Sequence, residues 1–324
     1  MDTITPDPIM RIASGFMASK FLFAASEFGF FDALEDSPAD LAALAARTGL
    51  TTRSARILAD GCVALGLLEK QVDTYANSAE AAAFLTRGGL APGMRFWDQI
   101  SYLSWASFAQ TLAHGPQQSA VELPPALQQV MLAGIEAITA GPTAALVASV
   151  DVREHRRLLD LGCGNGSWST ALLRANPNLS ATLVDLPVAI GATRAHVSES
   201  GLADRVTIQG ADVLTDALPH GHDLVMVNNL LHYFDPDTNN SLLAKVARVS
   251  EPGTRLLLAD FWTDAAHISP VAAALMAGEF AAHVPDGDVY SIDEISAWLA
   301  SAGWQFQAHH PLAGPMSLVS ATRV

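Results

Sequence analysis

The second half of the chain alternates between short, near-continuous apolar runs and longer segments with helical spacing. The apolar runs are residues 158–161, 181–184, 206–208, 224–227 and 255–259. Strands with few polar positions are buried on both faces, so runs separated by helices predict a parallel sheet covered on both sides. Residues 305–324 read as two further strands joined by a turn at Gly314 and Pro315, which would add an antiparallel edge strand. We therefore predict a doubly wound α/β domain over residues 151–324.

The first 88 residues show helical spacing instead. The predicted elements are a long helix at 9–34, shorter helices at 37–45 and 53–65, and a small hairpin at 66–77. Helix, turn, helix and hairpin form a winged-helix pattern, so we expect an all-α winged-helix domain in residues 1–88. Such a domain either reads DNA or serves as a packing module. Only Arg53 and Arg56 are basic in its second helix, which favours packing.

Residues 89–150 are predicted to form a helical connector that also supplies substrate-pocket helices. Within it, residues 94–112 hold a cluster of aromatic side chains at helical spacing. Such a cluster is usually core or an inter-subunit contact, and some of its rings can also line a pocket. The apolar stretch 130–150 contains one charge, Glu136, and is interrupted by Gly141 and Pro142. We expect two buried helices or one kinked helix there, and not a membrane span.

The composition restricts the classes of binding partner and the cellular compartment that we expect for this protein. Of 324 residues, 50% are hydrophobic and 16% are charged, which is enough to bury a large core. The net charge of −15 repels phosphate backbones and anionic lipid, so we expect no nucleic acid or membrane partner. Cys62 and Cys163 give no disulfide framework, and the N-terminus lacks the basic start and apolar core of a signal peptide. We expect a soluble protein in the reducing cytoplasm.

A glycine-rich turn follows the first predicted strand of the α/β domain. Gly162, Gly164 and Gly166 are spaced Gly-x-Gly-x-Gly between a strand and a helix, where backbone can approach a nucleotide-like ligand closely. A pyrophosphate site has Gly-x-Gly-x-x-Gly instead, so the spacing disfavours an NAD-dependent dehydrogenase. Asp160 stands before the first glycine, where it would repel a phosphate and suit a cationic amino-acid group.

Two further acids follow the next predicted strands. Asp185 ends the second strand, where a carboxylate either accepts from ribose hydroxyls or caps a helix. Asp212 follows the third strand, where it would accept from an adenine amine or serve as a turn residue. Together with Asp160 and the glycines, these acids describe a site for adenosine plus a charged amino acid, without phosphate. That combination indicates S-adenosylmethionine as the cofactor.

On these motifs the chain resembles a class I methyltransferase of the cation-independent O-methyltransferase family, which includes caffeic acid and hydroxyindole methyltransferases. The resemblance covers nearly the whole chain and includes Phe-Gly-Phe-Phe-Asp-Ala-Leu at 28–34 and Leu-Gly-Leu-Leu at 65–68. It implies a Rossmann-like methyltransferase domain after a dimerisation domain that exchanges contacts within a homodimer. The positions that it implies for cofactor contact are Gly162, Asp185, Asp212, Val213 and Asn228.

The resemblance also implies a catalytic base. The family's catalytic histidine follows the fourth strand, and His232 holds that position here, at the carboxyl end of a strand beside the cofactor crevice. Tyr233 and Phe234 replace the family's usual Asp and Trp. Two acids accompany the histidine in the family. The first is kept as Asp260, shortened from Glu, and would orient His232, whereas the second, expected near Asp288, is not clearly present.

We expect methyl transfer to a small, largely apolar acceptor, aromatic or acyl, with O-methylation favoured, His232 as general base and no metal. Because the donor is already activated, most of the catalysis would come from alignment. Candidate pocket walls are Trp97, Met131, Ile135, Phe261, Trp262, Met276 and Phe280. One alternative is iron-assisted C-methylation of a 2-oxo acid, with a non-haem iron held by His232 and His283. A non-enzymatic winged-helix regulator is the other alternative.

Overall fold

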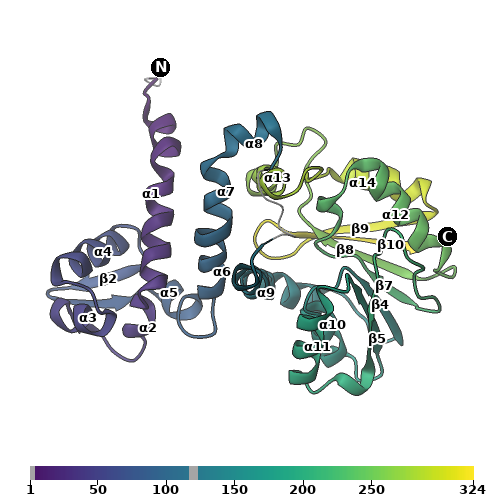
Figure 1. Ribbon diagram of the computed structural model, residues 1–324, viewed down its shortest axis with the longest axis horizontal. Helices are drawn as coiled ribbons and strands as arrows, with labels where there is room; N and C mark the ends of the chain where they lie inside the picture. Colours follow the sequence, from purple (N-terminus) through teal and green to yellow (C-terminus); the bar gives the residue numbers. More distant parts are fainter. Residues whose placement is uncertain (1–3, 117–122) are drawn as a thin grey trace. The chain divides into compact units, whose positions relative to one another are not determined.

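A computed structural model describes residues 4–116 and 123–324 (Figure 1). The chain forms two compact units. The N-terminal unit comprises Met1–Leu103 and Pro124–Ile138, and the C-terminal unit comprises Ser104–Leu123 and Thr139–Val324. Helix α9, Pro125–Ser149, belongs to both units because their boundary falls inside it. The predicted three-part division, with boundaries after residues 88 and 150, stays a prediction.

The N-terminal unit contains a small sheet and several helices. Its elements are α1 (Asp7–Glu27), α2 (Phe30–Ala33), β1 (Ala39–Asp40), α3 (Leu41–Thr48), α4 (Thr52–Ala64), β2 (Leu68–Gln71), β3 (Thr74–Asn77), α5 (Ala79–Phe84), α6 (Ala91–Phe96) and the π-helix η1 (Trp97–Ser101). Asp40 and Thr51 accept hydrogen bonds from backbone amides and so cap the starts of α3 and α4. β3 pairs antiparallel with both β1 and β2. Helix, helix and hairpin follow in the predicted order, and the winged-helix description itself stays a prediction. The expectation of an all-α domain is wrong, because the hairpin pairs with β1 to form a three-stranded sheet.

Helix α1 buries little of its apolar surface within the chain. Ala25 is the one buried residue of this helix, and residues 4–19 are all exposed. Ile9, Ile12 and Phe16 follow the spacing of a single helical face, and between 50% and 83% of each side chain is accessible. An exposed apolar stripe of this kind typically marks a surface that another protein covers.

The C-terminal unit contains a seven-stranded sheet. From α7 onward the elements are α7 (Tyr102–Ala106), α8 (Phe108–His114), α9, β4 (Arg157–Leu161), α10 (Ser167–Ala175), β5 (Ser180–Asp185), α11 (Ile190–Glu199), η3 (Ala203–Arg205), β6 (Val206–Gly210), β7 (Leu224–Met226), η4 (Leu231–Tyr233), α12 (Pro236–Arg248), β8 (Arg255–Asp260), α13 (Val271–His283), α14 (Ile292–Ser301), β9 (Trp304–Pro311) and β10 (Ser317–Arg323). The strand order is β6-β5-β4-β7-β8-β10-β9. β4 to β8 are parallel, whereas β10 runs antiparallel to both β8 and β9. The predicted α/β fold is confirmed. The prediction of an antiparallel edge strand is wrong in one respect, because the antiparallel strand β10 is inserted next to β8 and the edge strand is β9.

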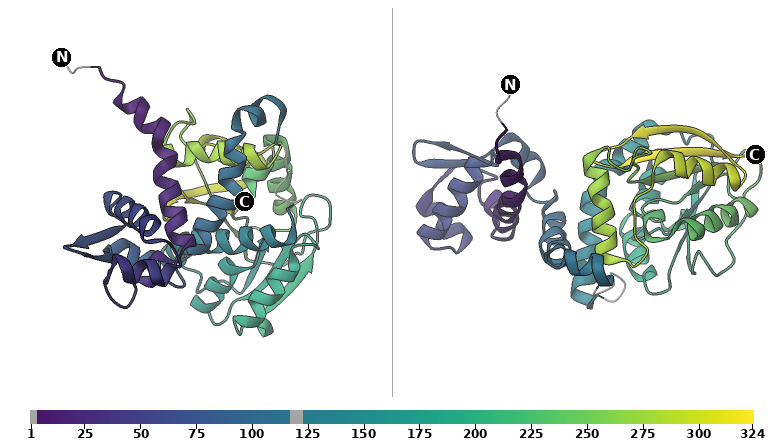
Figure 2. Two further views of the ribbon diagram at one scale, coloured as in Figure 1. Left: turned by 60° about the vertical axis from the view of Figure 1, so that its left-hand side comes forward. Right: turned by 90° about the horizontal axis from the view of Figure 1, so that it is seen from above.

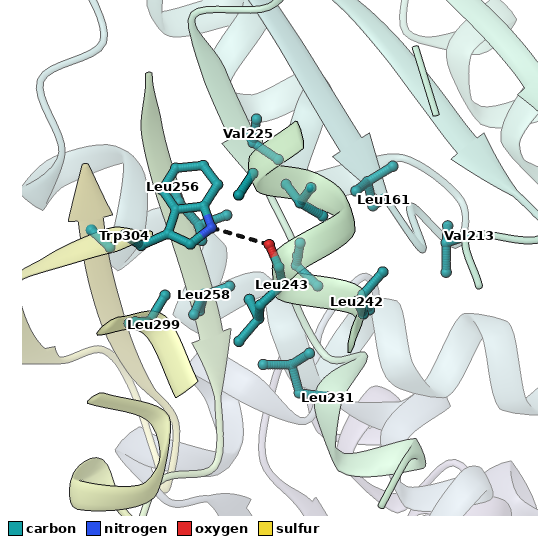
Figure 3. Close-up of a cluster of buried hydrophobic side chains, with 14 of the residues drawn as sticks. Leu161, Val213, Val225, Leu231, Leu242, Leu243, Leu256, Leu258, Leu299 and Trp304 are labelled. Atoms are coloured by element: carbon teal, nitrogen blue, oxygen red, sulfur yellow. Dashed lines mark hydrogen bonds between the residues drawn. The ribbon is translucent and has the colours of Figure 1, made fainter. Parts of the chain in front are cut away.

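Each face of the large sheet has its own buried cluster, because successive residues of a strand point to opposite sides. Leu158 of β4 packs with Leu172 of α10 on one face. Leu159 packs on the other face, in a cluster that includes Leu243 of α12 and Trp304. Figure 3 shows this second cluster, in which the Trp304 indole N–H donates to the Leu243 carbonyl at 3.2 Å. Helices α10 and α11 therefore cover one face, and α12 and α14 cover the other (Figures 1 and 2).

Helix α9 is the one element within residues 4–116 and 123–324 that is long and apolar enough to cross a membrane, by length and composition alone. Its segment Ala126–Ser149 has a mean hydropathy of 1.6. Core helices of water-soluble proteins meet the same criterion, so the finding is weak. Pro142 lies inside the helix, which is continuous. Of the two forms expected for this stretch, the division into two helices is wrong.

Candidate active site

The glycine turn joins β4 to α10 at the carboxyl end of the parallel strands. Gly162, Gly164 and Gly166 have φ angles of 72°, 56° and 85°, a region that glycine adopts without strain. A Cβ on Gly166 would lie 2.7 Å from a carbon of Leu183, so close packing also requires glycine there. A Cβ on Gly164 would have no other atom within 4 Å. The turn therefore presents bare backbone to open space at Gly164.

Asp185, at the end of β5, holds this turn in place. Its Oδ2 accepts a hydrogen bond from the Gly164 amide at 2.7 Å, and its Oδ1 accepts from the Leu186 amide at 2.7 Å. Burial raises the pKa of Asp185, and these two amides partly offset the effect. Each carboxylate oxygen keeps a second lone pair, so the group can accept from two further hydroxyls, as a ribose requires.

Asp160 lies beneath the turn and is almost inaccessible, with 2% of its surface exposed. Its Oδ2 accepts a hydrogen bond from the Ser169 hydroxyl at 2.6 Å. Burial raises the pKa of Asp160 to about 7, and the negative charge of Asp185 adds to the shift. No lysine or arginine among the described residues counteracts it. A buried acid without a cationic partner fits the amino-acid end of S-adenosylmethionine and disfavours phosphate.

The remaining predicted cofactor residues make local contacts in the structure. Asp212 accepts hydrogen bonds within its own turn, including one from the Leu214 amide at 2.8 Å. Val213 is buried in the core on the α12 face. Asn228 accepts from the Ala259 amide at 2.8 Å and so links the ends of β7 and β8. Cofactor contact by these three residues stays a prediction.

His232 and Asp260 form a buried pair. Because β7 and β8 are parallel neighbours, the residues that follow them meet at the same edge of the sheet. The His232 Nδ1 lies 2.7 Å from the Asp260 Oδ1, and only 6% and 3% of the two side chains are exposed. An ionised carboxylate only accepts hydrogen bonds, so Nδ1 carries the proton and Nε2 keeps a lone pair.

The outer atoms of this pair are unpartnered. The Asp260 Oδ2 is sealed from solvent and makes no hydrogen bond within the described part of the chain. The His232 Nε2 also makes no hydrogen bond there, but unlike the Asp260 Oδ2 it is not sealed from solvent. A histidine whose inner nitrogen is held by a carboxylate and whose outer nitrogen is open has the arrangement of a general base.

Aromatic rings surround the imidazole. Phe280 of α13 stacks on it with a centroid distance of 3.7 Å and an angle of 10° between the planes. The Tyr233 ring is tilted against it at 4.5 Å, and Phe261 meets it edge-on at 6.2 Å. Two of the predicted pocket residues, Phe261 and Phe280, therefore lie beside the predicted base. An aromatic environment of this kind suits a flat apolar acceptor.

The other predicted pocket residues are less closely tied to the histidine. Trp262 is buried in the core on the α12 face, and Met276 lies half-buried on α13. Trp97, Met131 and Ile135 are half-buried in the N-terminal unit. Their contact with an acceptor stays a prediction.

A second histidine–carboxylate pair lies on α13 and was missed by the sequence analysis. Glu279 is buried, its Oε1 lies 3.1 Å from the His283 Nε2, and its Oε2 accepts from the Trp105 indole at 2.5 Å. The i, i+4 spacing of Glu279 and His283 on a helix was the available signal. Glu279 also falls next to Phe280, so this pair adjoins the rings around His232.

Iron binding by His232 and His283 stays a prediction. Residues 4–116 and 123–324 contain no group of three or more histidine, cysteine, aspartate or glutamate side chains that could hold a metal ion. His283 is engaged with Glu279 and His232 with Asp260.

Near the expected second acid, the Asp288 amide donates to the His232 carbonyl at 3.1 Å, and the Asp288 side chain accepts from the amide of Val289. Asp288 thus braces the loop of His232.

The doubly wound sheet, with an acidic glycine turn that disfavours phosphate, defines the class of S-adenosylmethionine-dependent methyltransferases. The chain belongs to the O-methyltransferase family, because a family profile described as O-methyltransferase domain matches residues 108–305. A second profile, O-methyltransferase dimerisation domain, matches residues 10–87. The predicted enzyme class, family and cofactor are therefore confirmed.

Individual relatives cover almost the full chain. It is 30% identical to the tetracenomycin polyketide synthesis 8-O-methyl transferase of Streptomyces glaucescens, over 97% of this chain and 95% of that protein. It is 31% identical to the 3-hydroxy-5-methyl-1-naphthoate 3-O-methyltransferase of Streptomyces sahachiroi, over 92% and 89%. The crystal structure of human N-acetylserotonin methyltransferase with S-adenosylmethionine shares the fold, with a TM-score of 0.88, 22% identity and 99% coverage of both chains.

Proposed function

We propose that this methyltransferase transfers a methyl group to the hydroxyl of a small aromatic metabolite, with His232 as the general base. The observation that supports this proposal most directly is the buried pair of His232 and Asp260, whose outer nitrogen is open. One bacterial relative is named for 8-O-methylation in the synthesis of the tetracenomycin polyketide, and the other for 3-O-methylation of a hydroxynaphthoate, a flat aromatic compound that suits the rings around His232.

The bound cofactor supplies a methyl group that is already activated by a sulfonium charge. Asp160 offsets that ligand's positive charge, Asp185 accepts from its ribose hydroxyls, and the bare backbone at Gly164 allows close approach. His232 takes the proton of the acceptor hydroxyl on Nε2, which makes the oxygen a better nucleophile. Asp260 holds Nδ1–H and stabilises the imidazolium that forms. Phe280 fixes the plane of the imidazole by stacking.

Replacing His232 tests the base assignment. We expect His232→Ala to lower kcat by about 10²- to 10⁴-fold, since this is the usual contribution of a general base. The affinity for S-adenosylhomocysteine, measured by calorimetry, should stay within about twofold because His232 is not one of the cofactor acids. His310→Ala is the matched control, because His310 is exposed on β9. Full turnover by His232→Ala would remove the base assignment.

We further propose that the protein acts as a cytoplasmic homodimer in which α1 is covered by a second copy. The match to a dimerisation domain and the exposed stripe of Ile9, Ile12 and Phe16 support this. A helix that leaves these side chains open in water would lose about 1.5–3 kcal/mol for each large residue not buried. Light scattering at decreasing concentration tests the state of assembly, and a monomer at micromolar concentration contradicts it.

A further inference from the structure

Tyr233 stands at a chemically prominent position that the proposed reaction leaves without a role. It follows His232 in the short helix η4, and its ring is tilted against the imidazole at a centroid distance of 4.5 Å. It also faces Phe280 at 6.4 Å. The phenol therefore belongs to the same group of rings as the predicted base.

The hydroxyl of Tyr233 lacks a partner, unlike that of comparable tyrosines. Tyr75 donates to Asp60 at 2.8 Å, and Tyr290 donates to the carbonyl of Phe234. The Tyr233 hydroxyl makes no hydrogen bond with any described residue, and its oxygen is not sealed from solvent. Phenols in half-buried positions normally find a partner. An open hydroxyl beside the reacting group is therefore available to a ligand.

The charges around this hydroxyl decide what kind of ligand atom it can meet. Burial raises the pKa of Tyr233 to about 12, and the carboxylates of Asp260, Asp185 and Glu279 add to the shift. The phenol stays protonated at any physiological pH and acts as a donor, not as a base. The same three carboxylates repel an anionic group, so a neutral oxygen is the favoured partner.

We propose that Tyr233 is a specificity-determining residue, which donates a hydrogen bond to an uncharged carbonyl oxygen next to the hydroxyl that becomes methylated. Two adjacent oxygens of the acceptor would then meet two adjacent residues: the hydroxyl faces His232, and the carbonyl faces Tyr233. The acceptor class is an aromatic ortho-hydroxy ketone or quinone without a free carboxylate nearby. This inference rests on the proposed O-methylation and adds the second recognition group to it.

The cofactor is the other ligand that the hydroxyl could reach, because Asp185 is among its charged neighbours. Two observations favour the acceptor. The ring of Tyr233 lies against His232, which is the proposed base for the acceptor hydroxyl. Asp185 is instead tied to the glycine turn through Gly164 and Leu186. The experiment must therefore separate an effect on acceptor recognition from an effect on cofactor affinity.

A pair of acceptors that differ only in the carbonyl gives this separation. 8-Hydroxy-1-tetralone carries the ketone beside the hydroxyl, and 5,6,7,8-tetrahydro-1-naphthol has a methylene in its place. We expect Tyr233→Phe to lower kcat/KM for the ketone about tenfold and to change that for the naphthol less than twofold, since one neutral hydrogen bond is lost. The dissociation constant of S-adenosylhomocysteine should not change. Tyr290→Phe, which removes a structural hydroxyl, should leave the ratio of the two acceptors as in the wild type.

Other outcomes would contradict the role of Tyr233 and leave the assignment of His232 as general base unaffected. An equal loss for both acceptors, a weaker affinity for S-adenosylhomocysteine, or a wild-type enzyme that does not prefer the ketone would each exclude the role of Tyr233. If turnover is too slow, binding of both probes to the enzyme saturated with S-adenosylhomocysteine gives the same comparison, and failure to bind the ketone excludes the acceptor class. Failure of the proposed O-methylation itself would show separately, as the absence of an O-methylated product from either acceptor with the wild-type enzyme.

Discussion

Asp260→Asn removes the charge that faces the imidazole while keeping the shape of the side chain. The Nδ1–Oδ1 distance is 2.7 Å, and only 6% and 3% of the two side chains are exposed, so solvent screens the pair poorly. With charge centres about 4 Å apart and an effective dielectric constant of about 20, the carboxylate stabilises an imidazolium by about 4 kcal/mol. This energy is gained as the proton arrives, so its loss raises the barrier. The expected fall in kcat approaches about 1,000-fold.

Single-turnover measurements with saturating cofactor are the appropriate assay, because they exclude product release from the observed rate. Calorimetry with S-adenosylhomocysteine should show unchanged affinity, and a thermal melt should confirm that the variant is folded. Asp237→Asn is the matched control, since it removes the same charge from an exposed position in the first turn of α12. A folded Asp260→Asn enzyme that keeps more than a tenth of wild-type kcat would refute the idea that Asp260 supports the base.

Four further perturbations follow from the structure. Because burial raises the pKa of Asp160 to about 7, we expect the affinity for S-adenosylhomocysteine to weaken as pH falls through 7, and Asp160→Asn to flatten this dependence in calorimetry. The Asp160 carboxyl keeps its proton up to about pH 7 in the folded state, whereas in the unfolded state it loses the proton near the ordinary aspartate pKa. The folded state therefore loses stability as the pH rises from that ordinary value to about 7. Asp160→Asn removes this loss and should raise Tm at pH 8. Gly164→Ala should weaken cofactor affinity at least tenfold, but it should lower the free energy of unfolding by only about 1 kcal/mol because no other atom lies near the new Cβ. Gly166→Ala should lower the free energy of unfolding by about 2–3 kcal/mol in denaturant unfolding, because its Cβ would contact Leu183. Trp304→Ala should cost about 3–5 kcal/mol, as it removes a core side chain that is 2% exposed. Phe16→Asp should convert a dimer into monomers in size-exclusion chromatography.

Each of these has an outcome that contradicts it. A cofactor affinity that is constant from pH 5 to 8 would mean that Asp160 does not meet the cationic end of the ligand. Equal stability losses for the two glycine variants would deny the difference in their surroundings. Wild-type stability of Trp304→Ala would place that ring outside the core. A Phe16→Asp protein that stays dimeric would move the interface away from α1.

Most of the C-terminal fold was predictable because buried parallel strands have an unmistakable pattern. The apolar runs at 158–161 and 181–184 correspond to β4 and β5 with boundaries shifted by one residue. The insertion of β10 between β8 and β9 was not predictable, since strand order depends on pairing across the whole domain. β1 was also missed, because two residues, Ala39 and Asp40, carry too little periodicity to stand out from a helix cap.

The site was predictable where a motif fixed both position and chemistry. His232 follows β7 and Asp260 is the last residue of β8, and the parallel pairing of these strands brings the two side chains to 2.7 Å. Glu279 was missed because a single acid in an apolar helix reads as a solvent-facing residue, and its burial depends on Trp105 from a distant segment. The stacking of Phe280 on the imidazole at 3.7 Å likewise depends on packing, which the sequence pattern does not specify.

The position of β10 has a consequence for how the large sheet assembles. This strand, Ser317–Arg323, lies between β8 and β9, although β9 precedes it in the chain. Within the described residues β9 pairs with β10 alone, so it can join the sheet only after β10 has paired with β8. That pairing joins two segments far apart in the chain, 255–260 and 317–323, and contacts of this kind form slowly. Substitutions that weaken β10 would therefore detach β9 as well and expose the edge of β8.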